Sequence, residues 1–123
     1  MTVLPSPANV YGFLLSPTGL EQVAAVLQSR LGLTETEVYI GKSADNYHQI
    51  LYIHTAVYEF EIRKVQQRTW SICGTIAGDR SEILRVLKYL STPLHYAGDE
   101  TAFEVYDAEF NCIAEYSGSE RDP

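Results

Sequence analysis

The chain has 123 residues, of which 46% are apolar and 20% are charged, a composition typical of a folded domain and unlike that of a disordered segment. No apolar run reaches the length of about 18 residues that a membrane span requires. The amino terminus, "MTVLPSPANVYGFLLSP", lacks the basic region of a signal peptide. We therefore expect a cytoplasmic protein with one domain over residues 1–117 and a flexible tail over 118–123.

The charge is distributed unevenly along the chain. Residues 1–98 contain eight acidic and eight basic side chains, whereas residues 99–123 contain eight acidic side chains and one basic side chain. The whole net charge of −7 therefore lies in the last 25 residues. An acidic segment repels nucleic acid and anionic membranes, and it attracts basic molecules over long distances. We expect a basic protein partner, and neither nucleic acid nor membrane binding.

The first half of the chain predicts one strand, one helix and three further strands. "VYGFLL" (10–15) is a run of strand formers, and the segment after it has helical periodicity. Thr18 and Glu21 have the spacing of a capping box, and Gly32 ends the helical pattern. Three strands follow, in "EVYIG" (37–41), "QILYIHT" (49–55) and "VYEFEIRKV" (57–65).

The second half predicts a similar order. "TWSICGTIA" (69–77) is a strand, and Asp79 with Glu82 forms a capping box at the start of the next helix. Pro93 is expected to end that helix, because proline cannot donate the hydrogen bond of a helix interior. Three short strands are then predicted around "LHYA" (94–97), "AFEVYD" (102–107) and "NCIAEY" (111–116).

Together these patterns predict an α+β fold in which two helices cover an antiparallel sheet or sheets. The repeated order suggests paired modules of strand, helix and three strands, over about 10–66 and 69–117. A ferredoxin-like α+β sandwich with extra strands remains the alternative.

Two short motifs resemble the vicinal oxygen chelate superfamily, which includes glyoxalases and bleomycin-resistance proteins. "SRLGLTETEVY" is similar to the helix end that precedes the family's second strand, and "YDAEFNCIAEY" is similar to its closing hairpin. The resemblance implies metal ligands on the first, fourth, fifth and last strands. Only the fourth and last of these strands offer a carboxylate at a matching position, from Glu59 or Glu61 and from Glu115. The resemblance therefore implies a member without a metal, and we expect no cofactor.

Two alternative functions follow from these observations. The first is a small apolar ligand bound between the two halves and lined by Tyr58, Phe60 and Trp70. The second is an enzyme in which Glu59, Glu61 or Glu115 performs acid and base chemistry. Neither the three histidines nor the two cysteines have the spacing of a metal site. Cys73 and Cys112 are expected to be buried thiols, and a disulfide between them is left open.

The leading hypothesis is a non-catalytic protein-binding module that uses its acidic C-terminal hairpin, as an immunity protein or an inhibitor of a basic partner does. Tyrosine suits such an interface because it offers a large and stiff contact surface. A homodimer is compatible with the sequence. The residues predicted to contact the partner are Glu104, Tyr106, Asp107, Glu109, Phe110, Glu115 and Tyr116.

Phe110 occupies a turn in which glycine is usual. A bulky residue with positive φ costs about 1 kcal/mol or more, whereas asparagine tolerates that region. We therefore predict a loop of four residues, 108–111, in which Asn111 and not Phe110 is left-handed. Phe110 is then free either to pack back on the sheet or to project as an apolar anchor.

Overall fold

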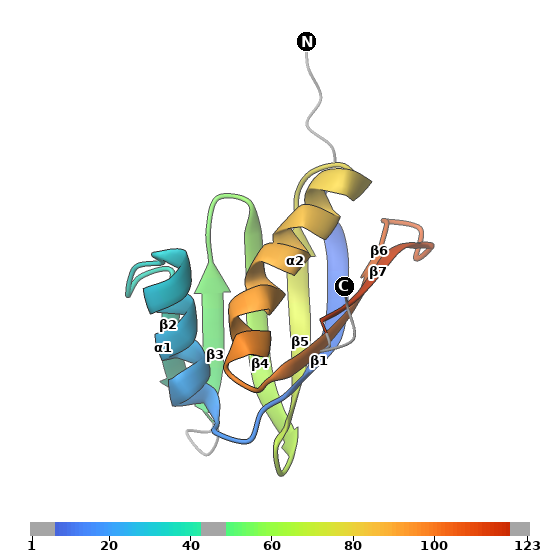
Figure 1. Cartoon of the computed structure of the whole chain (residues 1–123). Coiled ribbons are helices and arrows are strands. Elements are labelled where there is room, and N and C mark those ends of the chain that lie inside the picture. The colour runs from blue at the N-terminus through green and yellow to red at the C-terminus, as the bar shows by residue number, and fades with distance from the viewer. Residues whose placement is uncertain (1–6, 43–48, 119–123) are drawn as a thin grey trace.

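The computed structural model describes residues 7–42 and 49–118, and within them seven strands form one antiparallel sheet with two helices over one face (Figure 1). The predicted α+β class is confirmed. The strand order is β2-β3-β4-β5-β1-β6-β7. The elements are β1 (Ala8–Leu15), α1 (Leu20–Leu31), β2 (Val38–Lys42), β3 (Gln49–His54), β4 (Tyr58–Gln66), β5 (Thr69–Ile76), α2 (Arg80–Tyr96), β6 (Glu100–Tyr106) and β7 (Cys112–Gly118).

Strand β1 is central and joins the two predicted halves. Tyr11 on β1 lies opposite Cys73 on β5 and opposite Glu104 on β6. The middle of the sheet is therefore formed by pairing of β1, near the start of the chain, with β5 and β6, which are distant from it in sequence. Within the described residues two strands follow α2, where the sequence predicted three.

The predicted strand at 94–97 is wrong, because α2 continues through Pro93 to Tyr96. Leu90 and Leu94 are both buried, so the apolar stripe of the helix extends beyond the proline. Proline inside a helix costs about 3 kcal/mol, and burying a leucine stabilises by about 1.5–3 kcal/mol. The helix then closes where Asp99 N donates to Leu94 O at 2.9 Å, after Gly98 with a positive φ.

The two helices begin differently. In α2, Asp79 accepts a hydrogen bond from Glu82 N while the Glu82 side chain accepts one from Asp79 N, as predicted for a capping box. The capping box predicted at Thr18 is absent, since the N-cap of α1 is Gly19 and no side chain caps the helix. Ser16 Oγ instead accepts hydrogen bonds from Thr18 N and Gly19 N in the preceding turn.

The core lies between the sheet and the helices. On β1, β4 and β5 every second residue points towards the helices, and the buried residues at these positions are apolar. At two of them, Gly12 and Gly74, a Cβ would strike the carbonyl oxygen of Ala102 and of Glu59 respectively, so neither strand has room for a side chain there. The members buried in the core from α1 and α2 are Leu20, Val23, Ala24, Val26, Leu27, Ile83, Leu87, Leu90 and Leu94.

Candidate functional site

The sheet face opposite the helices, which we call the open face, is covered by no helix in the described ranges 7–42 and 49–118 (Figure 1). Alternation along β1 directs Val10 and Leu14 into the core and Tyr11 and Phe13 onto this face. Tyr11 is 43% exposed and Phe13 is 56% exposed. Two large aromatic side chains therefore stand next to each other on a central strand in contact with solvent.

The strand register aligns one row of side chains across the whole open face. Glu104 lies opposite Tyr11 on one side and opposite Glu115 on the other. Directly opposed side chains on neighbouring strands lie about 5 Å apart, so members of the row contact their neighbours. From β2 to β7 the row reads Tyr39, Tyr52, Glu61, Cys73, Tyr11, Glu104 and Glu115.

A shallow groove of about 520 Å³ runs over the β5, β1, β6 and β7 part of this face. Tyr11 and Phe13 supply its aromatic surface, and Glu104 and Glu115 supply its carboxylates. Such a combination suits a ligand with both apolar and cationic groups, because a cation can contact an aromatic ring and a carboxylate together.

The two glutamates of the groove carry like charges directly opposite each other. Tyr106 OH donates a hydrogen bond to Glu104 Oε2, and this bond raises the pKa of Tyr106 to about 12. The rings of Tyr11 and Tyr106 meet edge to face with centroids 5.8 Å apart. Tyr106 therefore holds one carboxylate in place beside the aromatic wall of the groove.

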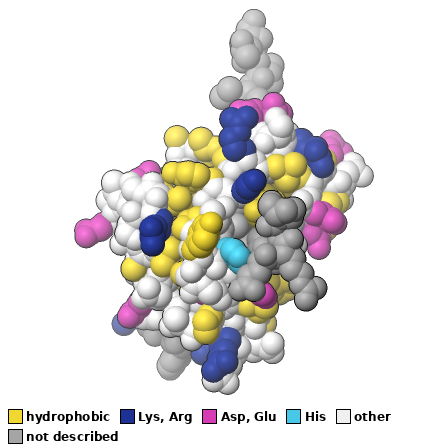
Figure 2. Space-filling model, viewed as in Figure 1, with side chains coloured by type: hydrophobic (Ala, Val, Ile, Leu, Met, Phe, Trp, Pro, Cys, Tyr) yellow, Lys and Arg dark blue, Asp and Glu magenta, His cyan; other side chains and the backbone are white. Residues whose placement is uncertain are grey.

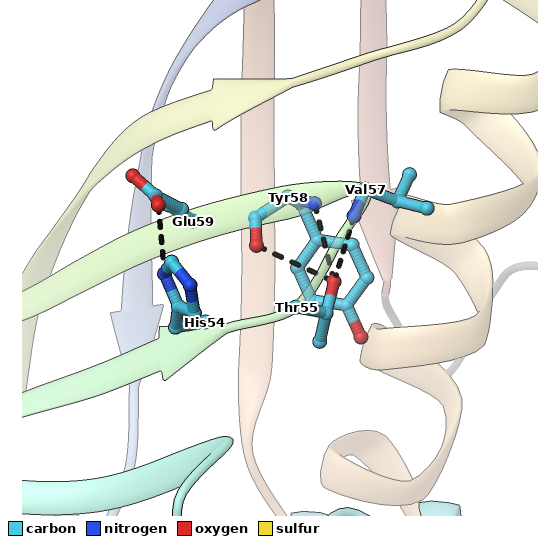
Figure 3. Close-up of polar contacts among 5 residues, drawn as sticks. All are labelled: His54, Thr55, Val57, Tyr58 and Glu59. Carbon is cyan, nitrogen blue, oxygen red and sulfur yellow. Dashed lines mark hydrogen bonds and ion pairs between the residues drawn. The ribbon is translucent and has the colours of Figure 1, made fainter.

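The other half of the open face has its acidic residues paired with basic ones. His54 Nδ1 lies 2.7 Å from Glu59 Oε1 (Figure 3), and Arg63 donates to Glu61 Oε2 at 2.8 Å. Figure 3 also shows the turn beside this pair, where Thr55 Oγ1 accepts hydrogen bonds from the backbone of the following residues. By contrast, β1, β6 and β7 contain three glutamates and no lysine or arginine.

The hairpin tip differs from the prediction, because Phe110 and not Asn111 has the positive φ, at 62°. Phe110 N donates to Asp107 O at 3.1 Å, and Asp107 N donates to Asn111 O at 3.0 Å, which closes a shorter loop than the four residues expected. Asp107 Oδ1 also accepts from Glu109 N and Asn111 N, which lowers the pKa of Asp107 and holds the turn. Phe110 is 71% exposed and projects from the tip.

Tyr116 lies on the opposite face from the other predicted contact residues. It packs against the core on the helix side, as does Ala114 on the same strand. Glu115 lies between them and faces the groove. The signal for this was present in the sequence, since neighbouring residues of a strand point to opposite faces.

The three aromatic residues predicted to line a small-molecule cup are buried in the core. Tyr58 is 9% exposed, Phe60 is 3% exposed and Trp70 is 7% exposed. The enclosed space beside Phe60 measures about 20 Å³, which is near the smallest volume that admits one water molecule.

Among the candidate acid and base residues, Glu61 lies opposite Cys73 on β5, and Glu115 Oε1 lies 3.9 Å from Cys112 Sγ, but no histidine stands beside either thiol in the described residues to complete a nucleophilic site. Cys73 is on β5 and His54 is on β3, so β4 separates them by two strand spacings of about 4.8 Å each. Cys73 and Cys112 are both free and exposed, not buried as predicted. Among the described residues, no three His, Cys, Asp or Glu side chains form a group that could hold a metal ion.

The acidic C-terminal run begins with a buried residue, Asp99, which is 2% exposed. Neither of its carboxylate oxygens has a well-formed hydrogen bond. Burial raises the pKa of Asp99, and the nearby Ser16 hydroxyl lowers it by a smaller amount. The buried hydroxyl of Thr101, two residues after Asp99, instead donates a hydrogen bond to Ser91 Oγ at 2.8 Å. Asp99 is thus a poorly compensated carboxyl inside the fold.

A scan of protein-family models found no match, and neither did searches of curated proteins and solved structures. The resemblance to the vicinal oxygen chelate superfamily therefore stays a prediction. None of the described helices has the length and apolar character needed to cross a membrane.

Tyr11 and Phe13 are absent from the residues predicted for binding. In "VYGFLL" both alternating sets of positions are apolar, so the pattern does not show which set faces solvent. The signal that could have identified them is the pairing of β1 with β6, which brings Tyr11 beside Glu104.

Proposed function

We propose that this chain is a non-catalytic protein-binding module, and that the groove over β1, β6 and β7 binds a basic segment of a partner protein. The observation that carries the proposal is the pairing of two exposed aromatic residues, Tyr11 and Phe13, with two glutamates that have no basic neighbour on these strands.

The chemistry of the groove explains the preference for a basic segment. Glu104 and Glu115 oppose each other and repel, so a lysine or arginine placed between them relieves the repulsion and gains two ion pairs. Tyr11 lies next to Glu104 and offers its ring to the same cation or to the apolar stem of its side chain. Acidic residues elsewhere in the C-terminal run increase the rate at which a basic partner arrives.

An exposed row of this kind is more easily explained by binding than by catalysis. The carboxylates that could act as an acid and base pair, Glu59 and Glu61, are each paired with a basic side chain on an exposed strand surface. An immunity protein or an inhibitor of a basic toxin or nuclease is a protein with the properties proposed here.

Nuclear magnetic resonance with a synthetic peptide tests the proposal. The probe is a nine-residue peptide of alternating lysine and leucine, added to ¹⁵N-labelled protein. We expect amide shifts to concentrate in β1, β6 and β7, and we expect the E104K/E115K variant to lose them. A peptide of alternating glutamate and leucine serves as the matched control and should cause no shifts in these strands.

Shifts spread evenly over the surface, or centred on β3 and β4, would contradict the proposal. So would an E104K/E115K variant that binds the lysine peptide as tightly as the native chain does. The folded state of the variant is checked by the dispersion of its own amide spectrum.

A further inference from the structure

A second groove, of about 780 Å³, lies between the two helices on the side away from the open face. Figure 2, which views the molecule from the helix side, shows basic and apolar side chains interspersed over this layer. We call this region the helix groove. It is lined by Arg30, Leu31, Arg85, Lys88, Tyr89, Thr92, Pro93 and Tyr96.

The three cations of the helix groove, Arg30, Arg85 and Lys88, form no ion pair within residues 7–42 and 49–118. Arg30 lies in the last turn of α1, where the helix dipole favours a positive charge. Arg85 and Lys88 lie in the first half and the middle of α2, so the dipole of that helix does not explain them.

Apolar surface accompanies these charges. Tyr89 is 55% exposed and Tyr96 is 84% exposed, and both line the groove. Exposed aromatic surface bordered by unpaired cations fits a segment that has an apolar anchor flanked by carboxylates.

The hairpin tip of this same chain has that composition. Phe110 is 71% exposed and is held in a left-handed conformation that costs about 1 kcal/mol or more for a bulky residue. Asp107 and Glu109 come shortly before it in the chain, and no lysine or arginine lies between Asp99 and Gly118. The tip is thus a projecting aromatic side chain preceded by two carboxylates.

The tip and the helix groove of one molecule cannot meet. Helix α1 lies over the β2 edge of the sheet, whereas the tip connects β6 and β7 at the opposite edge. In Figure 1 the tip projects from the side of α2 that faces away from α1. The two complementary surfaces can therefore contact each other only between different copies of the chain.

We propose that the hairpin tip of one copy docks in the helix groove of a second copy, with Phe110 against the groove tyrosines and with Asp107 and Glu109 facing Arg85 and Lys88. The inference rests on the proposed function in that it treats the C-terminal hairpin as a recognition element. It goes further by assigning the tip to self-association and leaving the open face to the basic partner.

The symmetry of this contact has a consequence for assembly. Tip and groove are different surfaces, so the contact is heterologous, and each dimer keeps one free tip and one free groove. The tip is small, so its contact is at the weak end of protein interfaces. We expect association that grows with protein concentration and weakens as salt screens the charges.

Sedimentation velocity with two complementary variants tests the proposal. The tip variant is E109K/F110G, which keeps the Asp107 hydrogen bonds that hold the turn. The groove variant is R85E/K88E. We expect the native chain to associate between micromolar and millimolar concentration, and we expect each variant alone to associate at least tenfold more weakly.

An equimolar mixture of the two variants is the decisive experiment, because only the proposed contact predicts that mixing restores association. The native tip of the groove variant can dock in the native groove of the tip variant, so the mixture should form a one-to-one dimer. The control variant, E21K/E35K, reverses two exposed charges outside both surfaces and should associate as the native chain does.

A native chain that stays monomeric at millimolar concentration would overturn the proposal, and so would a mixture that stays monomeric. Association that survives in both single-surface variants would also overturn it. The E104K/E115K variant keeps both surfaces and should still associate, so failure of peptide binding and failure of self-association are separate results.

Discussion

Both halves of the open face carry tyrosines and glutamates, but only the β3 and β4 half places basic side chains beside its glutamates. Over β3 and β4, Glu59 is paired with His54 and Glu61 is paired with Arg63. Over β1, β6 and β7, Glu104 and Glu115 oppose each other, and the nearest partner is a neutral tyrosine. The unpaired half is the observation on which the proposed binding of a positively charged partner rests.

The largest expected effect comes from two glycines of the central strands, Gly74 where the two halves of the open face meet and Gly12 within the β1, β6 and β7 half. In both G74A and G12A the new methyl group would strike a backbone oxygen of the neighbouring strand, β4 for Gly74 and β6 for Gly12. We expect each to lower the free energy of unfolding by about 3 kcal/mol, with G74A the more severe because its Cβ also meets Phe60. Urea denaturation measures both, and two separate transitions would contradict a single continuous sheet.

Asp99 is an unpaired acidic residue of the same C-terminal run, but it lies in the interior of the fold and not on the open face. Burial raises its pKa above the ordinary value of 3.8, so the folded state is penalised whenever the carboxyl is ionised. The penalty is full above the folded pKa and disappears as pH falls through the folded pKa towards 3.8.

We therefore expect D99N to raise the free energy of unfolding at pH 7 by about 1–2 kcal/mol. The gain should shrink on acidification, as followed by thermal unfolding over a pH series. A gain that is equal at acidic and neutral pH would contradict the assignment to ionisation, and E35Q, at an exposed carboxylate, is the control.

Replacing Phe110 tests whether the backbone strain of its positive φ serves binding at the hairpin tip. Glycine adopts positive φ without steric cost, so F110G should stabilise the chain by about 1 kcal/mol while it removes the apolar anchor. Thermal unfolding measures the stability and sedimentation measures the association. A destabilised F110G chain would show that Phe110 serves the fold and not a contact.

The smallest effect compares one glutamate from each half of the open face. E115Q removes the repulsion with Glu104, so it should stabilise by about 0.5 kcal/mol. E61Q removes the ion pair with Arg63, so it should destabilise by a similar amount, about 0.5 kcal/mol. Urea denaturation should therefore show changes in the free energy of unfolding of opposite sign. Changes of the same sign would show that the two halves do not differ.

Local patterns in the sequence predicted most elements but not their long-range arrangement. The capping residues Asp79 and Glu82 predict the start of α2 because a capping box involves only four consecutive residues. The continuation past Pro93 depends on the burial of Leu94 against the sheet, which no local pattern records. The acidic hairpin was visible as a charge run, whereas its aromatic neighbours on β1 became visible only through the pairing of β1 with β6.

The most direct test of the central claim compares neutralised glutamates in the two halves of the open face. E104Q/E115Q and E59Q/E61Q remove the same charge from the same surface, and each is titrated with the lysine and leucine peptide by isothermal calorimetry. We predict that E104Q/E115Q weakens binding about tenfold, as the loss of two exposed ion pairs implies, and that E59Q/E61Q leaves binding unchanged. Equal weakening in both variants would show that the peptide responds only to net charge, and it would contradict a dedicated binding surface on β1, β6 and β7.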